Sequence, residues 1–394
     1  MKKTLKDFDF KGKKVLVRVD FNVPLEDGEV TDNTRIEAAL PTINYLIDEG
    51  GKVILMSHLG RPGGEVDESL RMDPVAKELA EELGQEVAKA DDCIGDEVKA
   101  AVGNLDNGEV LVLENTRFYP GEKANDPDFA RELAAPADIF INDAFGACHR
   151  AHASTVGVTR HLPSGAGFLV QRELNALGAV LENPEHPFVV IMGGAKVSDK
   201  LGAIRNLMKY ADYFLLGGGI ANTFIRAKGY EVGESLHEAE KLDLARELME
   251  EAKEKGVELV MPIDLVVAEE FAKDANHKIV MVDEIPAGWQ CLDTGGPKTL
   301  EKYCEIIAKA KNVVWNGPLG VFEMEAFAKG TNEVAKAMAE ADARTVIGGG
   351  DSAAAVKKAG FEDAMTHIST GGGASLMFFE GETLPAVAAL DDVE

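Results

Sequence analysis

The sequence predicts an α/β protein of two Rossmann-like three-layer domains with parallel sheets, joined by a hinge helix. Short β-rich runs alternate with helical patterns along the whole chain, as in parallel sheets covered by helices on both faces. A chain of 394 residues with 45% hydrophobic content is longer than one core usually serves, so two domains are expected. The strands of the two halves also end differently, which predicts two unlike sites.

Strands of the first half run from apolar residues into polar or charged ones. The runs are KVLVRVDFN, KVILMSHLGR, EVLVLENTRF and DIFINDAFG. Ligands of open α/β sheets bind beyond the carboxyl ends of the strands, and arginine there suits carboxylate or phosphate. This half therefore predicts a site for a small polyanion with a hydroxyl group. The candidate residues are Arg18, Asp20, Asn22, Arg35, His58, Arg61, Arg117, His149, Arg150 and His152.

A linking segment follows at residues 163–187. Gly165 and Gly167 precede a helix-like run from about Phe168 to Leu181, which predicts a linking helix with a flexible start. Such a helix would act as a hinge between lobes that close on two substrates.

Strands of the second half run into glycines instead. The runs are FVVIMGGAK, YFLLGGGIAN, VVWNGPLG, TVIGGGDS and HISTGGGAS. Glycine clusters at 217–219, 348–350 and 371–373 exceed what turns need and favour backbone contact with a nucleotide or another phosphorylated ligand. Lys196 and Lys200, at the head of a predicted helix, would place two cations on its phosphates; a solvated surface pair is the alternative.

Asp351 stands at the start of the helix that follows the second glycine cluster. A carboxylate there would repel phosphates unless it only caps the helix or a divalent cation lies between. Beside phosphates and two lysines, we interpret it as a magnesium ligand, with capping as the alternative.

Composition excludes other classes of protein. A net charge of −27, from 68 acidic and 41 basic residues, argues against a nucleic acid or an anionic membrane as partner. The start lacks the apolar core of a signal peptide and no apolar run is long enough to span a bilayer, so a cytoplasmic location is expected. The four cysteines are scattered along the chain, and we expect them to be reduced and to serve only in packing. They are Cys93, Cys148, Cys291 and Cys304.

Rival motifs are incomplete. Cys148, His149 and His152 form C-H-x-x-H without a fourth ligand, so zinc is not expected. The pattern G-x-G-x-x-A at residues 348–353 lacks the acidic residue about 20 positions on that would hold a dinucleotide ribose. An NAD-dependent dehydrogenase and a two-lobed binding protein without catalysis remain the alternatives to a phosphate-handling enzyme.

The chain closely resembles the phosphoglycerate kinase family from about residue 5 to 390. The motifs that carry the resemblance are DFN, SHLGRP, ENTRF, NDAFG, HRAH, GGAKVSDK, LGGG, WNGPLGVFE, GGGDS and STGGGAS. The resemblance implies reversible, Mg²⁺-dependent phosphoryl transfer from 1,3-bisphosphoglycerate to ADP, giving 3-phosphoglycerate and ATP. It also implies a cytoplasmic enzyme of glycolysis and gluconeogenesis, and we expect a monomer without nucleic-acid or membrane partners.

The resemblance assigns site residues to both halves. Arg35 and Lys196 would stabilise the transferring group, Glu323 would hold the ribose and Asp351 the magnesium ion. Phosphoglycerate would be bound by Asp20, Phe21, Asn22, Arg35, His58, Leu59, Gly60, Arg61, Arg117 and Arg150. The nucleotide would be bound by Lys200, Gly219, Asn316, Pro318, Glu323, Gly348, Gly349, Gly350, Asp351 and Ser352.

The domains follow from the same assignment. Residues 1–167, with a tail from about 380 to 394, would bind phosphoglycerate, and residues 168–379, including the linking helix, would bind the nucleotide.

Two departures from the family pattern are a longer CLDTGGPKT stretch, expected near the adenine, and Met377 where an acidic residue is expected. They bear on base specificity and on the packing of the tail.

Overall fold

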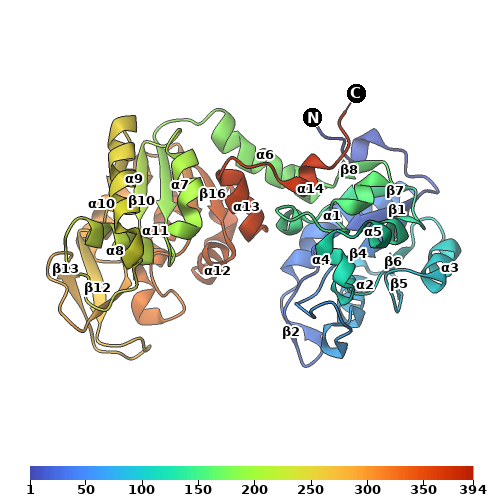
Figure 1. Cartoon of the computed structure of the whole chain (residues 1–394), viewed down its shortest axis with the longest axis horizontal. Helices are drawn as coiled ribbons and strands as arrows, with labels where there is room; N and C mark the ends of the chain where they lie inside the picture. The colour runs from blue at the N-terminus through green and yellow to red at the C-terminus, as the bar shows by residue number, and fades with distance from the viewer. Residues whose placement is uncertain (394) are drawn as a thin grey trace. The chain divides into compact units, whose positions relative to one another are not determined.

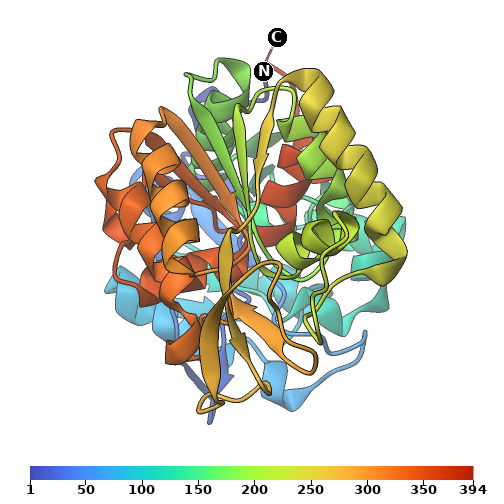
Figure 2. The same ribbon diagram turned by 90° about the vertical axis from the view of Figure 1, so that its left-hand side faces the viewer.

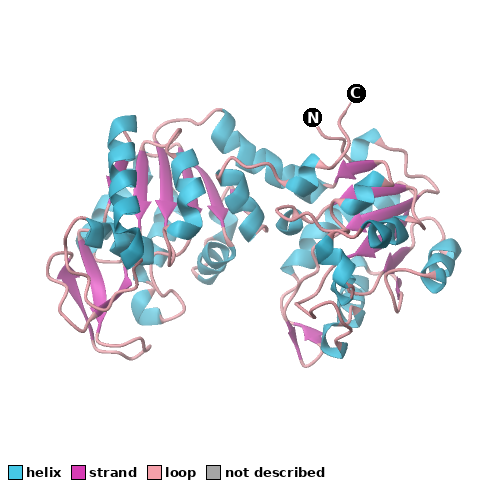
Figure 3. Cartoon of the chain, in the orientation of Figure 1, coloured by secondary structure: helices cyan, strands magenta, loops and turns pink. Residues whose placement is uncertain are grey.

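The computed structural model describes residues 1–393, and contacts divide the chain into two units. The first contains Met1–Asn175 and the C-terminal segment from Thr383, and the second contains Ala176–Glu382. Figure 1 labels the helices and strands along the chain, and Figure 3 colours them by type. No helix within residues 1–393 is long and apolar enough to cross a membrane.

The first unit is built on a six-stranded parallel sheet of order β5-β6-β4-β1-β7-β8. Its strands are β1 (Lys14–Arg18), β4 (Lys52–Met56), β5 (Val87–Lys89), β6 (Val110–Val112), β7 (Ile139–Asn142) and β8 (Ser164–Ala166). Its helices are α1 (Thr34–Asp48), α2 (Asp73–Leu83), α3 (Asp96–Asn104), α4 (Pro120–Ala124), α5 (Pro127–Ala134) and α14 (Pro385–Ala388). A short hairpin joins β2 (Leu25–Glu26) to β3 (Glu29–Val30).

The second unit has a six-stranded parallel sheet of order β11-β10-β9-β15-β16-β17. Its strands are β9 (Phe188–Met192), β10 (Tyr213–Leu216), β11 (Glu258–Val260), β15 (Asn312–Asn316), β16 (Arg344–Gly348) and β17 (His367–Ile368). Its helices are α7 (Leu201–Leu207), α8 (Gly218–Ala227), α9 (Leu242–Lys255), α10 (Pro297–Lys309), α11 (Lys329–Glu340), α12 (Gly350–Lys358) and α13 (Gly372–Phe379). Figure 2 shows α10 and α11 on one side of this sheet and α9 on the other.

Both sheets are buried on two faces, which is why their strands are continuous apolar runs. All five residues of β9 and of β15 are buried. In the second unit, Trp315 packs with Tyr303 of α10 and Met338 of α11 in one core cluster. The predicted fold of two parallel α/β domains is confirmed.

The sequence did not predict the small antiparallel sheet of order β13-β12-β14 in the second unit. It consists of β12 (Asp264–Ala268), β13 (His277–Met281) and β14 (Gln290–Asp293). Most of β13 is exposed, so its residues do not form the long apolar run by which the parallel strands were recognised.

The linking helix α6 (Phe168–Glu182) belongs to both units. The predicted boundary before Phe168 coincides with its first residue, whereas contacts divide the helix after Asn175. Its first half packs on the first unit, where the Phe168 and Tyr45 rings lie 5.2 Å apart. Its second half packs on the second unit, where Arg344 Nη1 donates to the Ala179 carbonyl at 2.8 Å.

The C-terminal segment packs against the start of the first unit. Lys2 Nζ lies 3.2 Å from Asp392 Oδ1, and Ser164 N donates to Asp391 Oδ2 at 3.0 Å. The predicted tail started at about residue 380, and its last residue, Glu394, lies outside the described residues. Met377 lies half-buried on α13, before this segment begins.

Candidate active site

The carboxyl ends of β1, β4, β6 and β7 bring the charged candidates of the first unit together. Arg35, at the start of α1, places Nη1 3.1 Å from both carboxylate oxygens of Asp20, which follows β1. Asn22 Oδ1 accepts from Gly60 N at 2.8 Å, and Arg117 Nη1 donates to the Gly60 carbonyl at 2.7 Å. These contacts join residues from three loops into one surface.

Arg18 is fully buried beneath this surface. Its guanidinium donates to Ser154 Oγ at 2.8 Å and to His58 Nδ1 at 2.9 Å. Because arginine can only donate, His58 Nδ1 must accept, and the proton of a neutral ring stands on Nε2. His58 therefore offers a neutral N–H donor on its other side.

The histidines here are uncharged at neutral pH. Burial, followed by the charges of Arg18 and Arg117, holds the pKa of His58 well below its usual range. Burial and the same arginines lower the pKa of His152 to about 4. The arginine charges that add to the effect of burial make this region positive, which suits a polyanion.

A cavity of about 390 Å³ opens beside these residues. Arg61 and Arg117, both predicted, line it together with Tyr119 and Lys123. Tyr119 follows a short 3₁₀ turn (Thr116–Phe118) and Lys123 lies in α4, so strand endings alone gave no signal for them.

Two predicted residues contribute no side chain to this surface. Phe21 and Leu59 are buried in the core, at 0% and 1% exposure. Their backbone N–H groups donate to Ser57 Oγ at 2.9 Å and to Asn115 Oδ1 at 3.1 Å, respectively. Arg150 is exposed and close enough to Arg117 and His152 for its charge to lower the pKa of each.

In the second unit, the sheet order reverses between β9 and β15, and the glycine loops meet at this point. Lys200 Nζ bridges the carboxyl ends of these two strands, where it donates to the carbonyls of Gly193, at 2.8 Å, and Asn316, at 3.0 Å. A Cβ on Gly317 (φ +92°) would lie 2.3 Å from Lys200 Nζ, so this turn requires glycine.

Lys196 and Lys200 do not both stand at the head of a helix, contrary to the sequence prediction. Lys196 is exposed in the loop after β9, whereas Lys200 ends a short 3₁₀ turn (Ser198–Lys200) before α7. Burial lowers the pKa of Lys200 to about 8, against the opposite effects of Asp351 and Asp199. Because burial disfavours the charged form of Lys200, an anion bound beside it would stabilise its ammonium group.

Asp351 does not cap its helix. The cap position of α12 is Gly349 (φ +95°), and Asp351 lies exposed in the first turn. Ser352, in contrast, is buried, and its Oγ accepts from Gly317 N at 2.6 Å. The capping alternative is thus excluded, and the Asp351 carboxylate is available beside Lys200.

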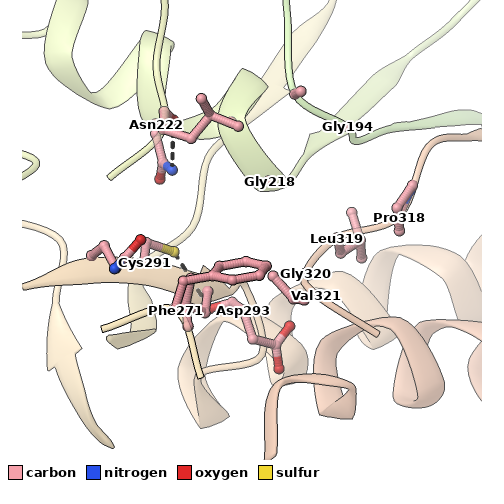
Figure 4. Close-up of a pocket in the computed structure, with 15 residues that line it drawn as sticks. Gly194, Gly218, Asn222, Phe271, Cys291, Asp293, Pro318, Leu319, Gly320 and Val321 are labelled. Carbon is pink, nitrogen blue, oxygen red and sulfur yellow. Dashed lines mark hydrogen bonds between the residues drawn. The ribbon is translucent and has the colours of Figure 1, made fainter. Parts of the chain in front are cut away.

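A mostly apolar cavity of about 240 Å³ adjoins these loops. Gly219 and Pro318, both predicted, line it with Asn222, Leu236 and other residues that the sequence did not single out. Figure 4 shows Asn222 and Gly194 on one side and Phe271, Cys291 and Asp293 on the other. Its volume lies below the roughly 300–1,000 Å³ of pockets that enclose whole ligands, so it suits a single flat ring.

Other predicted nucleotide residues lie outside this cavity. Glu323 is exposed, and its backbone carbonyl accepts from Lys358 Nζ at 3.1 Å. Gly348 and Gly350 lie at the junction of β16 and α12 rather than in the cavity wall. The CLDTGGPKT stretch does reach the cavity, through Cys291, Leu292 and Asp293.

Within residues 1–393, no three His, Cys, Asp or Glu side chains gather as a metal site. A cation held by one carboxylate and by phosphate oxygens needs no such cluster. The carboxylate of Asp351, which is exposed and does not cap α12, fits that kind of binding.

An arginine-rich sheet edge and a separate glycine-rich edge with two lysines define a phosphotransferase that acts on two different ligands. The family model described as "Phosphoglycerate kinase" matches residues 5–382. A phosphoglycerate kinase of Moorella thermoacetica is 59% identical over 391 residues, covering 99% of each chain.

Solved structures agree. The phosphoglycerate kinase of Coxiella burnetii is 39% identical, with a TM-score of 0.88 over 99% of this chain and 98% of its own. That of Pyrococcus horikoshii is 36% identical, with a TM-score of 0.85 over 98% of each chain. The chain belongs to the phosphoglycerate kinase family, as its motifs predicted. Its activity is that of a phosphotransferase with a carboxyl group as acceptor, in glycolysis and gluconeogenesis.

Proposed function

We propose that the chain transfers a phosphoryl group reversibly and in line between 1,3-bisphosphoglycerate and Mg·ADP, giving 3-phosphoglycerate and ATP. The observation that carries this proposal is the pairing of two unlike edges, one rich in arginine and one in glycine and lysine. Each edge suits one ligand, and the first and second units would be the phosphoglycerate-binding and nucleotide-binding domains.

In the first unit, the arginines and the Nε2–H of His58 would bind the carboxylate and phosphate of phosphoglycerate. The Asp20 carboxylate and Asn22 would orient its hydroxyl group. Arg35, now held by Asp20, would turn toward the transferring group. Support comes from the arginine charges, which add to burial in lowering the histidine pKa values and would also attract an anion.

In the second unit, the apolar cavity would hold the adenine ring and Glu323 would hold the ribose. Lys200 would exchange its two carbonyl partners for phosphate oxygens, and the N-terminus of α12 would contribute backbone N–H groups. Asp351 would hold Mg²⁺, which neutralises phosphate charge during transfer.

Phosphoryl transfer needs alignment and charge neutralisation more than a protein nucleophile. Arg35, from the first unit, and Lys196, from the second, would both stabilise the charge of the transferring group. We further propose that the two units close for transfer, which excludes water that would hydrolyse the acyl phosphate. A cytoplasmic, monomeric enzyme without nucleic-acid or membrane partners completes the proposal.

The test is ADP formation from Mg·ATP and 3-phosphoglycerate, with the acyl phosphate removed by glyceraldehyde-3-phosphate dehydrogenase and NADH. Activity that requires both substrates and magnesium is expected. Binding of both ligands without turnover would refute the proposed chemistry, and binding of NADH to the chain itself would favour a dehydrogenase.

A further inference from the structure

The loop that carries Lys196 has few anchors of its own. Residues 195, 196, 198 and 199 are exposed, and Val197 between them is fully buried. Among the described residues, the Lys196 side chain forms no hydrogen bond or ion pair, although its positive charge helps to lower the pKa of Glu238. Whatever orders this loop must therefore act on its backbone or on its neighbours.

Glu238 acts on the loop in this way. Its two carboxylate oxygens accept from Ser198 N at 2.9 Å and from Ser198 Oγ at 2.5 Å. Glu238 is only 7% exposed, and a buried carboxylate requires such donors. Although burial raises the pKa of Glu238, hydrogen bonds from Ser198 outweigh this effect, and the group stays below its ordinary value. The carboxylate is therefore ionised and holds the loop two residues after Lys196.

The backbone around Glu238 is itself fixed to the second unit. Glu238 N donates to Thr223 Oγ1 at 3.0 Å, and Thr223 Oγ1 donates to the Gly219 carbonyl at 2.9 Å. Two residues earlier, the Leu236 carbonyl accepts from Asn222 Nδ2 at 3.1 Å, a bond drawn in Figure 4. The segment that holds the Lys196 loop thus rests on α8, beside the apolar cavity proposed to hold the adenine, which we call the base cavity.

This segment also forms part of the cavity. Leu236 lines it and is 59% exposed, so a bound ring would cover it. Ser235 Oγ accepts from Cys291 N at 2.8 Å, which ties the segment to β14 on the other wall. Residues 235–238 therefore connect the walls of the base cavity to the loop that carries Lys196.

We propose that Glu238 is a positioning residue, which holds Lys196 against the transferring phosphoryl group by anchoring Ser198 to the wall of the base cavity. This inference rests on the proposed role of Lys196. Because Glu238 would act on the placement of Lys196 and not on the bound nucleotide, its loss should lower turnover more than nucleotide affinity.

The test is Glu238→Ala, assayed in the full chain with Mg·ATP and 3-phosphoglycerate. We expect kcat to fall about tenfold to a hundredfold, since misplacing a reacting group by about 1 Å has effects of that size. The Kd of ADP, from calorimetry, should change less than about threefold. Glu238→Gln should keep most activity, because its amide can accept from Ser198 N and donate to Ser198 Oγ.

Three further variants complete the design. Glu240→Ala, an exposed carboxylate two positions on, is the matched control and should leave kcat unchanged. Ser198→Ala removes only the hydroxyl bond and should reproduce part of the loss; it replaces Glu238→Ala if that variant fails to fold. In a Lys196→Ala background, Glu238→Ala should have little further effect on kcat, because both would remove one function.

An equal fall in kcat with and without Lys196 would overturn the inference, since a general loss of structure adds to any other defect. Unchanged kcat in both Glu238→Ala and Ser198→Ala would do the same. If Lys196→Ala alone keeps full kcat, the proposed role of Lys196 fails and this inference fails with it. Loss in Lys196→Ala without coupling to Glu238 would reject the inference alone.

Discussion

Raising the pH from 7 to 9 should weaken ADP binding through Lys200. Its ammonium donates to two backbone carbonyls in the free protein, and burial lowers its pKa to about 8. Only the protonated form can pair with phosphate oxygens. Binding to phosphate would therefore raise the pKa of Lys200 and take up a proton at pH values near 8.

The pKa sets the size of this effect. At pH 8, about half of the free protein carries an uncharged Lys200, so binding should take up about half a proton. At pH 9, only about one-tenth of the free protein is protonated, so affinity should be about tenfold lower than at pH 7. That change corresponds to about 1.4 kcal/mol of binding free energy.

Calorimetric titration of ADP in buffers of different ionisation enthalpy measures the proton uptake directly. Lys200→Met should bind ADP more weakly and with little pH dependence. Lys228→Met, which removes an exposed lysine, should keep the full dependence. Absence of proton uptake at pH 8, or the same pH dependence in Lys200→Met, would refute the assignment of Lys200 to the phosphates.

Three further substitutions test the site. Arg35→Ala should lower kcat by about 10²-fold or more while the Kd of ADP stays unchanged, because Arg35 lies in the other unit; equal losses in both would remove its role in transfer. Asp351→Ala should weaken Mg·ATP binding by about tenfold in calorimetry but not weaken binding of magnesium-free ATP, whose phosphates the carboxylate repels; an unaltered Kd for Mg·ATP would reject the metal assignment. Gly317→Ala should lower the free energy of unfolding by more than the roughly 1–2 kcal/mol that an alanine in the left-handed conformation costs, because its Cβ would clash with the Gly193 carbonyl and with Lys200 Nζ. Gly256→Ala, with φ +74° and no atom within 4 Å of its Cβ, is the matched control for denaturant unfolding, and equal losses would show that the close contacts of Gly317 with Gly193 and Lys200 are unimportant.

The linking helix shows how far local patterns reach. The predicted start at Phe168 is the observed start of α6, and the predicted end at Leu181 differs by one residue. Glycine and proline near the two ends mark such boundaries in the chain itself. The division of α6 between the two units was not predictable, because it depends on which residues pack on each half.

The sequence by itself determined the two parallel α/β domains, the family and the strand ends at which charged residues and glycines gather. Those features follow from hydrophobic periodicity and from motifs that are local in the chain. Only the tertiary structure decided that Phe21 and Leu59 turn into the core and that Lys200 bridges the ends of two strands.

The tertiary structure also decided that Glu238 reaches Ser198 across 40 residues. Burial, hydrogen-bond partners and pKa all depend on atoms brought together from distant positions. No pattern within a single segment carries that information.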